Sequence, residues 1–387
     1  MKNFINKKVL EIPPSGIRRF FDIIATMDEV ISLGVGEPDF DTPWHIRESS
    51  IYYIEQGYTT YTSNSGLIEL RETISKKLFQ EHYLEYNSQD QVLITVGVSE
   101  GLDLALRAIL NPGDEVIVHE PSYVSYKPCI IMAGGVPVVV ETKLDDDFQL
   151  RAEDVEKVIT KKTKAILISY PNNPTGAIIN KDNLTKIAKI VEKYDLLVIS
   201  DEIYGYLTYK GEHTCFATLP GMKDRTILLN GFSKAYAMTG WRIAYAASNR
   251  DIIKAMTKIH QYTMLCAPII SQKAAIEALN NGYSYMKSMI EEYNQRRRLI
   301  IESLNKIGLN CFKALGAFYV FPSIENTILS DEEFAEKLLL EEKVAVVPGS
   351  AFGDCGRNFI RCSYATSLNE IEEALKRIQR FFERYKK

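Results

Sequence analysis

The chain lacks several features that would assign it to a class at once. It has no run of about 18 apolar residues, so we expect no membrane-spanning helix. The N-terminal stretch MKNFINKKVLEIPPSG has no continuous apolar segment of the kind that a signal peptide needs. Six cysteines are spread over 387 residues without a Cys-x-x-Cys pair or a metal-type spacing to the five histidines. We therefore predict a cytoplasmic protein with reduced thiols and no metal site.

The chain also lacks an excess of charge of either sign. Its 46 Lys and Arg residues against 50 Asp and Glu residues give a formal net charge of −4. This balance offers no electrostatic reason to expect nucleic acid or an anionic membrane as a partner. Hydrophobic residues make up 46% and charged residues 25%, as in ordinary globular proteins. A chain of this length is expected to form one large domain and a smaller one.

Regular alternation of apolar strands and helices begins near residue 91. Runs such as AILIS, LLVIS and TILL are apolar throughout, which is typical of strands that are buried on both faces. The alternation predicts an α/β domain in which a mostly parallel sheet has helices on both sides. The expected strands are 91–96, 115–119, 136–141, 164–170, 196–200, 226–229 and 243–247.

The two ends of the chain have a different character. At the N-terminal end we expect an arm to Pro14, a helix over 16–27 and a short strand over 30–36. The C-terminal end should form an α+β unit with strands 317–321, 344–347 and 359–364 and helices 283–307, 331–341 and from 368 onward. We interpret Arg296–Arg298 as a solvated helix face. The expected division is 1–43 for the arm and part of the small domain, 44–282 for the large domain and 283–387 for the small C-terminal domain.

Polar residues follow the expected strands, where open α/β sheets bind their ligands. Val98 and Ser99 stand at the start of a helix, whose free N–H groups and dipole suit a phosphate. Asn173 lies in the turn PNNPTG, which is either an ordinary turn or a fixed one that aims the amide into a cleft. Asp201 follows a buried strand, where it could partner a cationic ring nitrogen or cap a helix. Tyr204 could present its phenol on the same side.

The stretch 230–242, NGFSKAYAMTGWR, places one lysine and one arginine after another apolar strand. Lys234 could act as an amine nucleophile toward a carbonyl cofactor, and Arg242 could hold that cofactor's phosphate. With the aromatic Tyr123 and with Asp201, these are the parts that are needed to hold pyridoxal phosphate. Lys234 would then form the Schiff base, and Asp201 would keep the pyridine nitrogen protonated.

The chain resembles the class I/II aminotransferases of the fold-type I pyridoxal-phosphate enzymes over essentially its whole length. It is most similar to the prokaryotic aromatic or broad-specificity branch, which shares the SGIR segment. The resemblance implies an aspartate-aminotransferase-like α/β fold: a large, cofactor-binding domain with a mostly parallel seven-stranded sheet between helices, plus a smaller α+β domain from both ends of the chain. It rests on LGVGEPDF, YTSNSG, PNNPTG, SDEIY, SKAYAMTGWR, GAFY, VVPGSAFG and FIRCSYA, in this order.

The resemblance also implies a role for each matching residue. The implied catalytic residues are Lys234, which would shuttle the proton between Cα and C4′ with a pKa lowered by nearby cations, together with Asp201 and Tyr204. The implied cofactor contacts are Tyr123 on the ring face, Asn173 and Tyr204 on the 3′ oxygen, and Val98, Ser99, Ser233 and Arg242 on the phosphate. Arg361 would clamp the substrate α-carboxylate, with help from Asn173 and the backbone of Gly36. Tyr61, in a loop whose tyrosines could also simply pack, would reach the phosphate of a partner subunit in a homodimer. Cis bonds are implied before Pro121 and Pro174.

The implied reaction is ping-pong transamination in amino-acid metabolism, by an aldimine/ketimine mechanism. The amino group of an L-amino acid, aromatic or from a broad range, would pass to a 2-oxo acid, with 2-oxoglutarate preferred. Gly231 replaces a second phosphate-binding serine that the family often has, and Ser99 stands where some aspartate-using relatives carry lysine. We also find no dedicated cation for a second substrate carboxylate. The alternatives are an aspartate, alanine or N-acyl-diaminopimelate aminotransferase, a C–S β-lyase and a cyclopropane-forming synthase.

Overall fold

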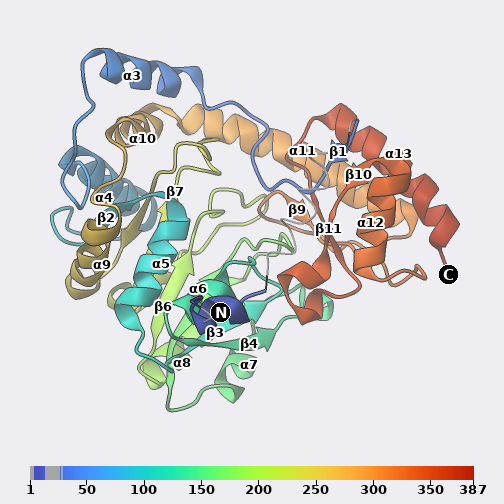
Figure 1. Cartoon of the computed structure of the whole chain (residues 1–387), viewed down its shortest axis with the longest axis horizontal. Coiled ribbons are helices and arrows are strands. Elements are labelled where there is room, and N and C mark those ends of the chain that lie inside the picture. The colour runs from blue at the N-terminus through green and yellow to red at the C-terminus, as the bar shows by residue number, and fades with distance from the viewer. Residues whose placement is uncertain (1–3, 14–26, 28) are drawn as a thin grey trace.

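A seven-stranded sheet forms the centre of the larger part of the molecule (Figure 1). The computed structural model describes residues 4–13, 27 and 29–387. All neighbouring strands are parallel except at β8, which runs antiparallel to β2 and to β7. The expected mostly parallel α/β sheet is therefore confirmed. In spatial order the strands are β2 (Val92–Thr95), β8 (Ala244–Ala247), β7 (Thr226–Gly231), β6 (Leu197–Asp201), β5 (Thr163–Ser169), β3 (Glu115–Glu120) and β4 (Val136–Glu141).

Helices cover both faces of this sheet. Successive residues of a strand point to opposite faces, so each strand contributes side chains to both helix layers. Val116 and Val118 of β3 pack on one side with α5 (Gly97–Ile109), α6 (Tyr126–Met132) and α9 (Arg250–Thr263). Ile117, between them, packs on the other side with α7 (Ala152–Lys157) and α8 (Lys181–Lys193). Further along that second side lie α4 (Ile68–His82) and α10 (Ile269–Asn281). The strands are buried on both faces, as their apolar runs predict.

The two ends of the chain meet in a second, smaller structure. β1 (Ile31–Ser32) pairs in parallel with β10 (Val344–Ala345). A separate antiparallel sheet has the order β11 (Val347–Pro348), β12 (Ile360–Ser363) and β9 (Tyr319–Val320). The single strand expected over 344–347 is therefore wrong: it divides at Val346 between two sheets. The helices here are α11 (Tyr283–Ile307), α12 (Asp331–Glu342) and α13 (Leu368–Tyr385).

A hydrophobic core of its own joins these terminal segments. Leu33, from the N-terminal side, packs in one cluster with residues of α11, α12 and α13. Figure 1 shows these helices on the right, and α11 running from the region of α10 toward them. The expected helix over 16–27 lies outside the described residues, apart from residue 27. The boundaries at 43/44 and 282/283 stay predictions.

The arginine cluster on α11 does not form a solvated face. Arg296 and Arg297 are only 4% and 6% exposed, although Arg298 is exposed. Arg296 donates to both carboxylate oxygens of Asp39 at 2.8 Å, and Arg297 donates to the carbonyl oxygen of Ala314 at 2.9 Å. The interpretation from the sequence is wrong, because the helix lies against the segment around residue 39 and the loop before β9.

The remaining helices are short or peripheral. α1 (Lys7–Glu11) and α3 (Trp44–Glu55) carry several exposed apolar side chains. In the part of the chain that the structure describes, no helix combines the length and the apolar composition needed to cross a membrane. All six cysteines are free thiols, and those at positions 215, 311 and 362 are buried.

Candidate active site

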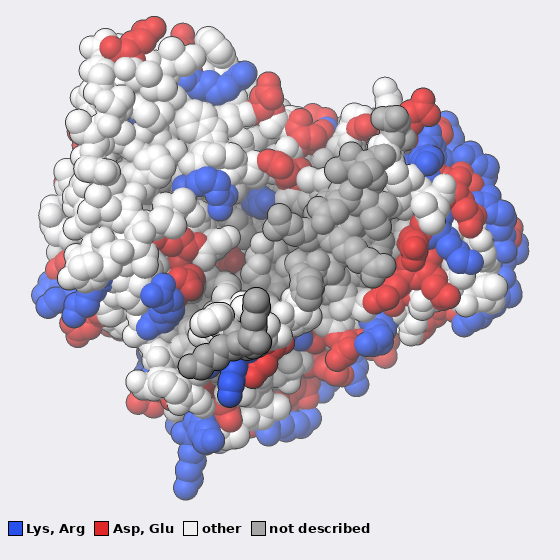
Figure 2. Space-filling view, viewed as in Figure 1, with Lys and Arg blue, Asp and Glu red and all other residues white. Residues whose placement is uncertain are grey.

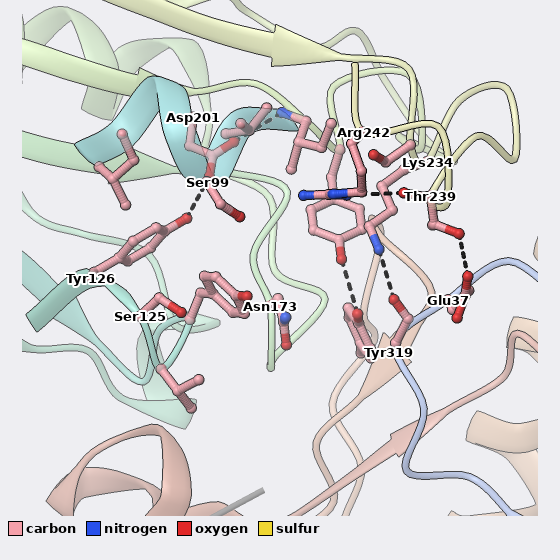
Figure 3. A pocket seen from close by; sticks show the side chains of 18 of the residues that line it. Glu37, Ser99, Ser125, Tyr126, Asn173, Asp201, Lys234, Thr239, Arg242 and Tyr319 are labelled. Carbon is pink, nitrogen blue, oxygen red and sulfur yellow. Dashed lines mark hydrogen bonds between the residues drawn. The ribbon is translucent and has the colours of Figure 1, made fainter. Parts of the chain in front are cut away.

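A cavity of about 850 Å³ lies at the carboxyl ends of β5, β6 and β7 and at the start of α5. Every predicted site residue lines it except Tyr61. Figure 3 labels Ser99, Asn173, Asp201, Lys234 and Arg242 among them. The smaller sheet and the segment after β1 close it from the other side. The residues brought together are Gly36, Val98, Ser99, Tyr123, Asn173, Asp201, Tyr204, Ser233, Lys234, Arg242 and Arg361.

Lys234 lies in the turn that follows β7, and its amine points across the cavity. Nζ donates to the carbonyl oxygen of Gly36 at 2.7 Å (Figure 3). Burial lowers the pKa of Lys234 to about 8, while Glu37 opposes this shift and the cations Arg361 and Arg242 add to it. Nearby cations, which the sequence leads us to expect to lower this pKa, do contribute, but burial has the larger effect. The lowered pKa increases the fraction of neutral amine near neutral pH, and the neutral amine is the form that a base or nucleophile requires.

Asp201 is the last residue of β6 and is 7% exposed. Its Oδ2 accepts a hydrogen bond from the Tyr126 hydroxyl at 2.8 Å, and its Oδ1 accepts from the backbone N–H of Ile203 at 3.2 Å. The residues that follow form a turn, so the helix-cap alternative is wrong. Burial raises the pKa of Asp201 to about 6. A buried carboxylate with unused lone pairs toward a cavity suits a cationic partner.

The start of α5 and Arg242 form the most evident anion site. Gly97 has φ +81°, and a Cβ there would lie 2.5 Å from a terminal nitrogen of Arg242, so glycine lets the guanidinium lie against the helix start. Nη1 of Arg242 also donates to the carbonyl oxygen of Thr239 at 2.9 Å. Val98 and Ser99 occupy the first turn of this 13-residue helix, and their side of the helix lines the cavity. N–H groups, a helix dipole and a fixed cation together suit a phosphate.

Arg361, a residue of β12, closes the opposite side of the cavity. It is 3% exposed and lies between two rings, 4.6 Å from the centroid of Tyr319 and 4.9 Å from that of Phe352. Its two terminal nitrogens donate to Asn173 Oδ1 at 2.9 Å and to the carbonyl oxygen of Gly34 at 2.5 Å. Its Nε has no hydrogen-bond partner among the described residues. A guanidinium fixed in this way can receive a carboxylate in a defined orientation.

Several cavity residues were not predicted. Tyr126 contacts Asp201, and the Tyr319 hydroxyl lies 2.9 Å from the Tyr204 hydroxyl. A Cβ on Gly36 would lie 2.3 Å from the Tyr319 hydroxyl oxygen, so the segment after β1 requires glycine there. Tyr319 belongs to the GAFY motif, which was a signal that could have been used. Further unpredicted lining residues are Glu37, Leu102, Val124, Ser125, Ile203, Thr239 and Gly240.

Three X–Pro peptide bonds near the site are cis, and two of their prolines lie in the PNNPTG turn. The bonds before Pro121 and Pro174 are cis, as the resemblance implies, and the bond before Pro171 is cis as well, which was not predicted. Within the PNNPTG turn, Asn172 Oδ1 accepts a hydrogen bond from the backbone N–H of Thr175 at 3.1 Å. The PNNPTG turn is therefore a fixed one that carries Asn173 into the cavity.

Residues 28–378 match the family described as aminotransferase class I and II. The chain belongs to this family. An aspartate aminotransferase from Pyrococcus abyssi is 44% identical over 95% of this chain and 96% of its own length. An aromatic-amino-acid aminotransferase from Thermococcus litoralis is 42% identical over the same shares. Among solved structures, the aromatic aminotransferase from Pyrococcus horikoshii has a TM-score of 0.91 at 42% identity, covering 94% of this chain and 99% of that one.

This class I/II protein is an aminotransferase that depends on pyridoxal 5′-phosphate and acts on amino and 2-oxo acids. Aspartate aminotransferase from Thermus thermophilus has the same fold, with a TM-score of 0.94 at 37% identity over 98% of this chain and all of that one. The residues present fit the cofactor: an amine from Lys234, a carboxylate from Asp201 and an anion site at the start of α5 line one cavity. Fold class and cofactor are thus confirmed.

Proposed function

We propose that this aminotransferase takes its amino group from aromatic L-amino acids, within a broad range, and passes it to 2-oxoglutarate by a ping-pong reaction. The supporting observation is the charge of the cavity wall. Among the described lining residues the cations are Lys234, Arg242 and Arg361. Since these have the cofactor and the α-carboxylate as partners, none is left for a second carboxylate on the donor, so an uncharged side chain is favoured.

The proposed acceptor, 2-oxoglutarate, differs from the proposed donor in its charge. 2-Oxoglutarate has a second carboxylate, and the cation that pairs with it would have to come from outside the described lining residues or from a partner subunit. Aspartate is the second candidate donor, because several close relatives are named aspartate aminotransferases. Ser99, in the first turn of α5, supplies no positive charge for that substrate.

The proposed division of labour follows the two sides of the cavity. Pyridoxal phosphate supplies an aldehyde that accepts the amino group and a ring that withdraws electrons from the substrate Cα. Lys234 would hold the cofactor at its aldehyde carbon and, when free, would move the proton at the substrate Cα. Asp201 holds the ring nitrogen, and Arg361 orients the substrate carboxylate with the backbone of Gly36.

Further contacts would hold the ring and its phosphate in place in this proposal. Tyr123 would cover one ring face, and Tyr204 and Asn173 would donate to the 3′ oxygen. Asn173 already accepts from Arg361, so one side chain connects the ring contact with the carboxylate contact. The phosphate is held by Arg242, by the Ser233 side chain and by the first turn of α5, which contains residues 98 and 99.

We also propose that two copies of the chain form a homodimer in which Tyr61 reaches the partner's phosphate. Tyr61 is 82% exposed, away from the cavity of its own chain. Large apolar side chains of α3 and of the C-terminal end of α9 are exposed too. Figure 2 shows mostly uncharged surface on the left of the molecule. Such a surface favours burial against another copy. These exposed residues are Trp44, Ile51, Tyr52, Ile54, Tyr262 and Met264.

Half-reaction spectra test the donor directly. The loaded enzyme is titrated with each common amino acid, and the loss of its visible cofactor absorbance is followed. Tyrosine and phenylalanine should convert the enzyme with at least about tenfold higher efficiency than aspartate, since an unpaired buried carboxylate is costly. Faster conversion by aspartate would replace the proposal with the second candidate. Incubation with cystathionine, followed by a pyruvate assay, tests the β-lyase alternative.

A further inference from the structure

Tyr126 links two parts of the cavity wall that lie far apart in the sequence. It is 2% exposed, at the start of α6, between β3 and β4. Its hydroxyl donates to Oδ2 of Asp201 at the end of β6, a buried contact between residues 75 positions apart (Figure 3). Because Ile203 donates to the other carboxylate oxygen, Asp201 has one fixed partner on each oxygen. The plane of the carboxylate is therefore set by two donors.

The ring of Tyr126 has a second neighbour in the same wall. It lies edge-on to the ring of Tyr123, with centroids 5.6 Å apart and an interplanar angle of 78°. Tyr123 is 36% exposed, so only part of its surface is held by neighbours. An edge-to-face contact of this kind is stabilising and directional. One buried side chain thus contacts both the carboxylate and the ring that are proposed to meet the pyridine of the cofactor.

We propose that Tyr126 is a positioning residue for the cofactor ring, which acts by fixing the Asp201 carboxylate through its hydroxyl and by bracing Tyr123 with its ring. The inference rests on the role proposed for Asp201. It assigns Tyr126 no direct contact with the reacting atoms. It predicts that loss of the hydroxyl by itself changes the strength and the pH dependence of cofactor binding.

The charges around Asp201 give the direction of that pH dependence. Burial raises its pKa most, and the hydrogen bonds from Tyr126 and from the Ile203 N–H lower it; Glu202 adds a smaller raising effect and Lys234 a smaller lowering one. Glu202 is itself paired with His213 on the loop that follows. Without the hydroxyl, the pKa of Asp201 rises further, so its ionised form persists over a narrower range of pH.

Tyr126→Phe tests the inference because it removes the hydroxyl and keeps the ring. We expect the dissociation constant of pyridoxal phosphate to rise about tenfold, as for the loss of one hydrogen bond to a charged group. When the visible absorbance of the bound cofactor is followed as the pH is lowered, its change on the acid side should occur at higher pH than in wild type. A 3-fluorotyrosine at position 126, a stronger donor, should move it to lower pH. kcat should fall while KM for the amino acid stays within about twofold.

Tyr86→Phe is the matched control. Tyr86 is 5% exposed, and its hydroxyl has no hydrogen-bond partner among the described residues. Removal of this hydroxyl should leave the dissociation constant and the absorbance titration unchanged. Thermal unfolding of the cofactor-free proteins shows whether either substitution disturbs the fold. A Tyr126→Phe protein that folds normally and binds the cofactor like wild type, with an unshifted titration, overturns the inference.

A double-mutant cycle with Asp201→Asn separates this inference from the proposed role of Asp201. If Tyr126 acts through the carboxylate, Tyr126→Phe should change cofactor affinity less than about twofold in the Asp201→Asn background. Full additivity would show a merely structural role for the hydroxyl and would overturn the inference. Unchanged cofactor binding by Asp201→Asn itself would instead refute the role of Asp201, whatever Tyr126→Phe does.

Discussion

The two walls of the cavity are built in different ways. On the wall formed by the seven-stranded sheet, Asp201 and Lys234 lie at or just after strand ends, where the alternation of strand and turn places them. On the wall formed by the smaller structure, Arg361 donates to the carbonyl oxygen of Gly34, 327 positions away. The cofactor side therefore follows from a repeated strand–turn pattern, whereas the substrate side exists only once both chain ends have met.

The two walls also divide the proposed chemistry. The sheet wall holds what the cofactor needs, and the wall with Arg361 holds what the substrate carboxylate needs. Lys234 Nζ crosses between them, since it comes from the sheet wall and donates to Gly36 on the other. Substitutions on the sheet wall should therefore change cofactor binding, and substitutions on the other wall should change substrate binding.

The largest effect is expected from Lys234→Ala on the sheet wall. Turnover should fall by about a thousandfold or more, because the nucleophile and the base at Cα are lost together. The visible absorbance of the bound cofactor should change at the same time. Lys210→Ala, at an exposed lysine, is the control and should behave like wild type. Normal turnover by Lys234→Ala would refute the proposed mechanism.

A smaller and different effect is expected from Arg361→Ala on the opposite wall. KM for the amino acid should rise roughly 10- to 100-fold, since charged hydrogen bonds to the carboxylate are lost. The absorbance of the bound cofactor should stay as in wild type, which steady-state kinetics and a spectrum can check together. Arg361→Lys should lie between, because lysine keeps the charge without the planar fork. An unchanged KM would contradict the clamp role.

The smallest effect concerns the stability of the cofactor-free protein. The pKa of Asp201 is about 6 in the fold against 3.8 for the reference carboxyl. Between these values the folded chain keeps a proton that the unfolded chain has released, so the contribution of Asp201 to stability falls as pH rises. Asp201→Asn should therefore gain unfolding free energy relative to wild type as the pH rises from 4 to 6, and the gain should level off above pH 6 at about 3 kcal/mol.

Urea denaturation at a series of pH values measures this gain. The exposed Asp145→Asn is the control and should show no gain that grows with pH. A pH-independent difference for Asp201→Asn would mean that burial of this carboxylate does not strain the empty fold. In that case the buried carboxylate of the sheet wall would not lower the stability of the cofactor-free protein, and the two walls would differ less than proposed.

Much of the sheet wall could be predicted because its signals are local. A buried apolar run followed by an aspartate or a turn with lysine is visible in the sequence, and every strand of the sheet was expected within one or two residues of its observed bounds. The other wall was predicted only by resemblance. Its failures are the division of 344–347 between two sheets and the burial of Arg296, because both depend on which distant segment covers them.

The sequence by itself determined the chemical types and their order: an amine at 234, a carboxylate at 201, an amide at 173 and a guanidinium at 361, with the α/β pattern that carries the first three. The tertiary structure decided their partners and their strength. Only packing brings the Tyr126 hydroxyl to Asp201 and the rings of Tyr319 and Phe352 to Arg361. Only burial brings the pKa of Lys234 to about 8, because desolvation depends on the atoms that surround the amine and not on its neighbours along the chain.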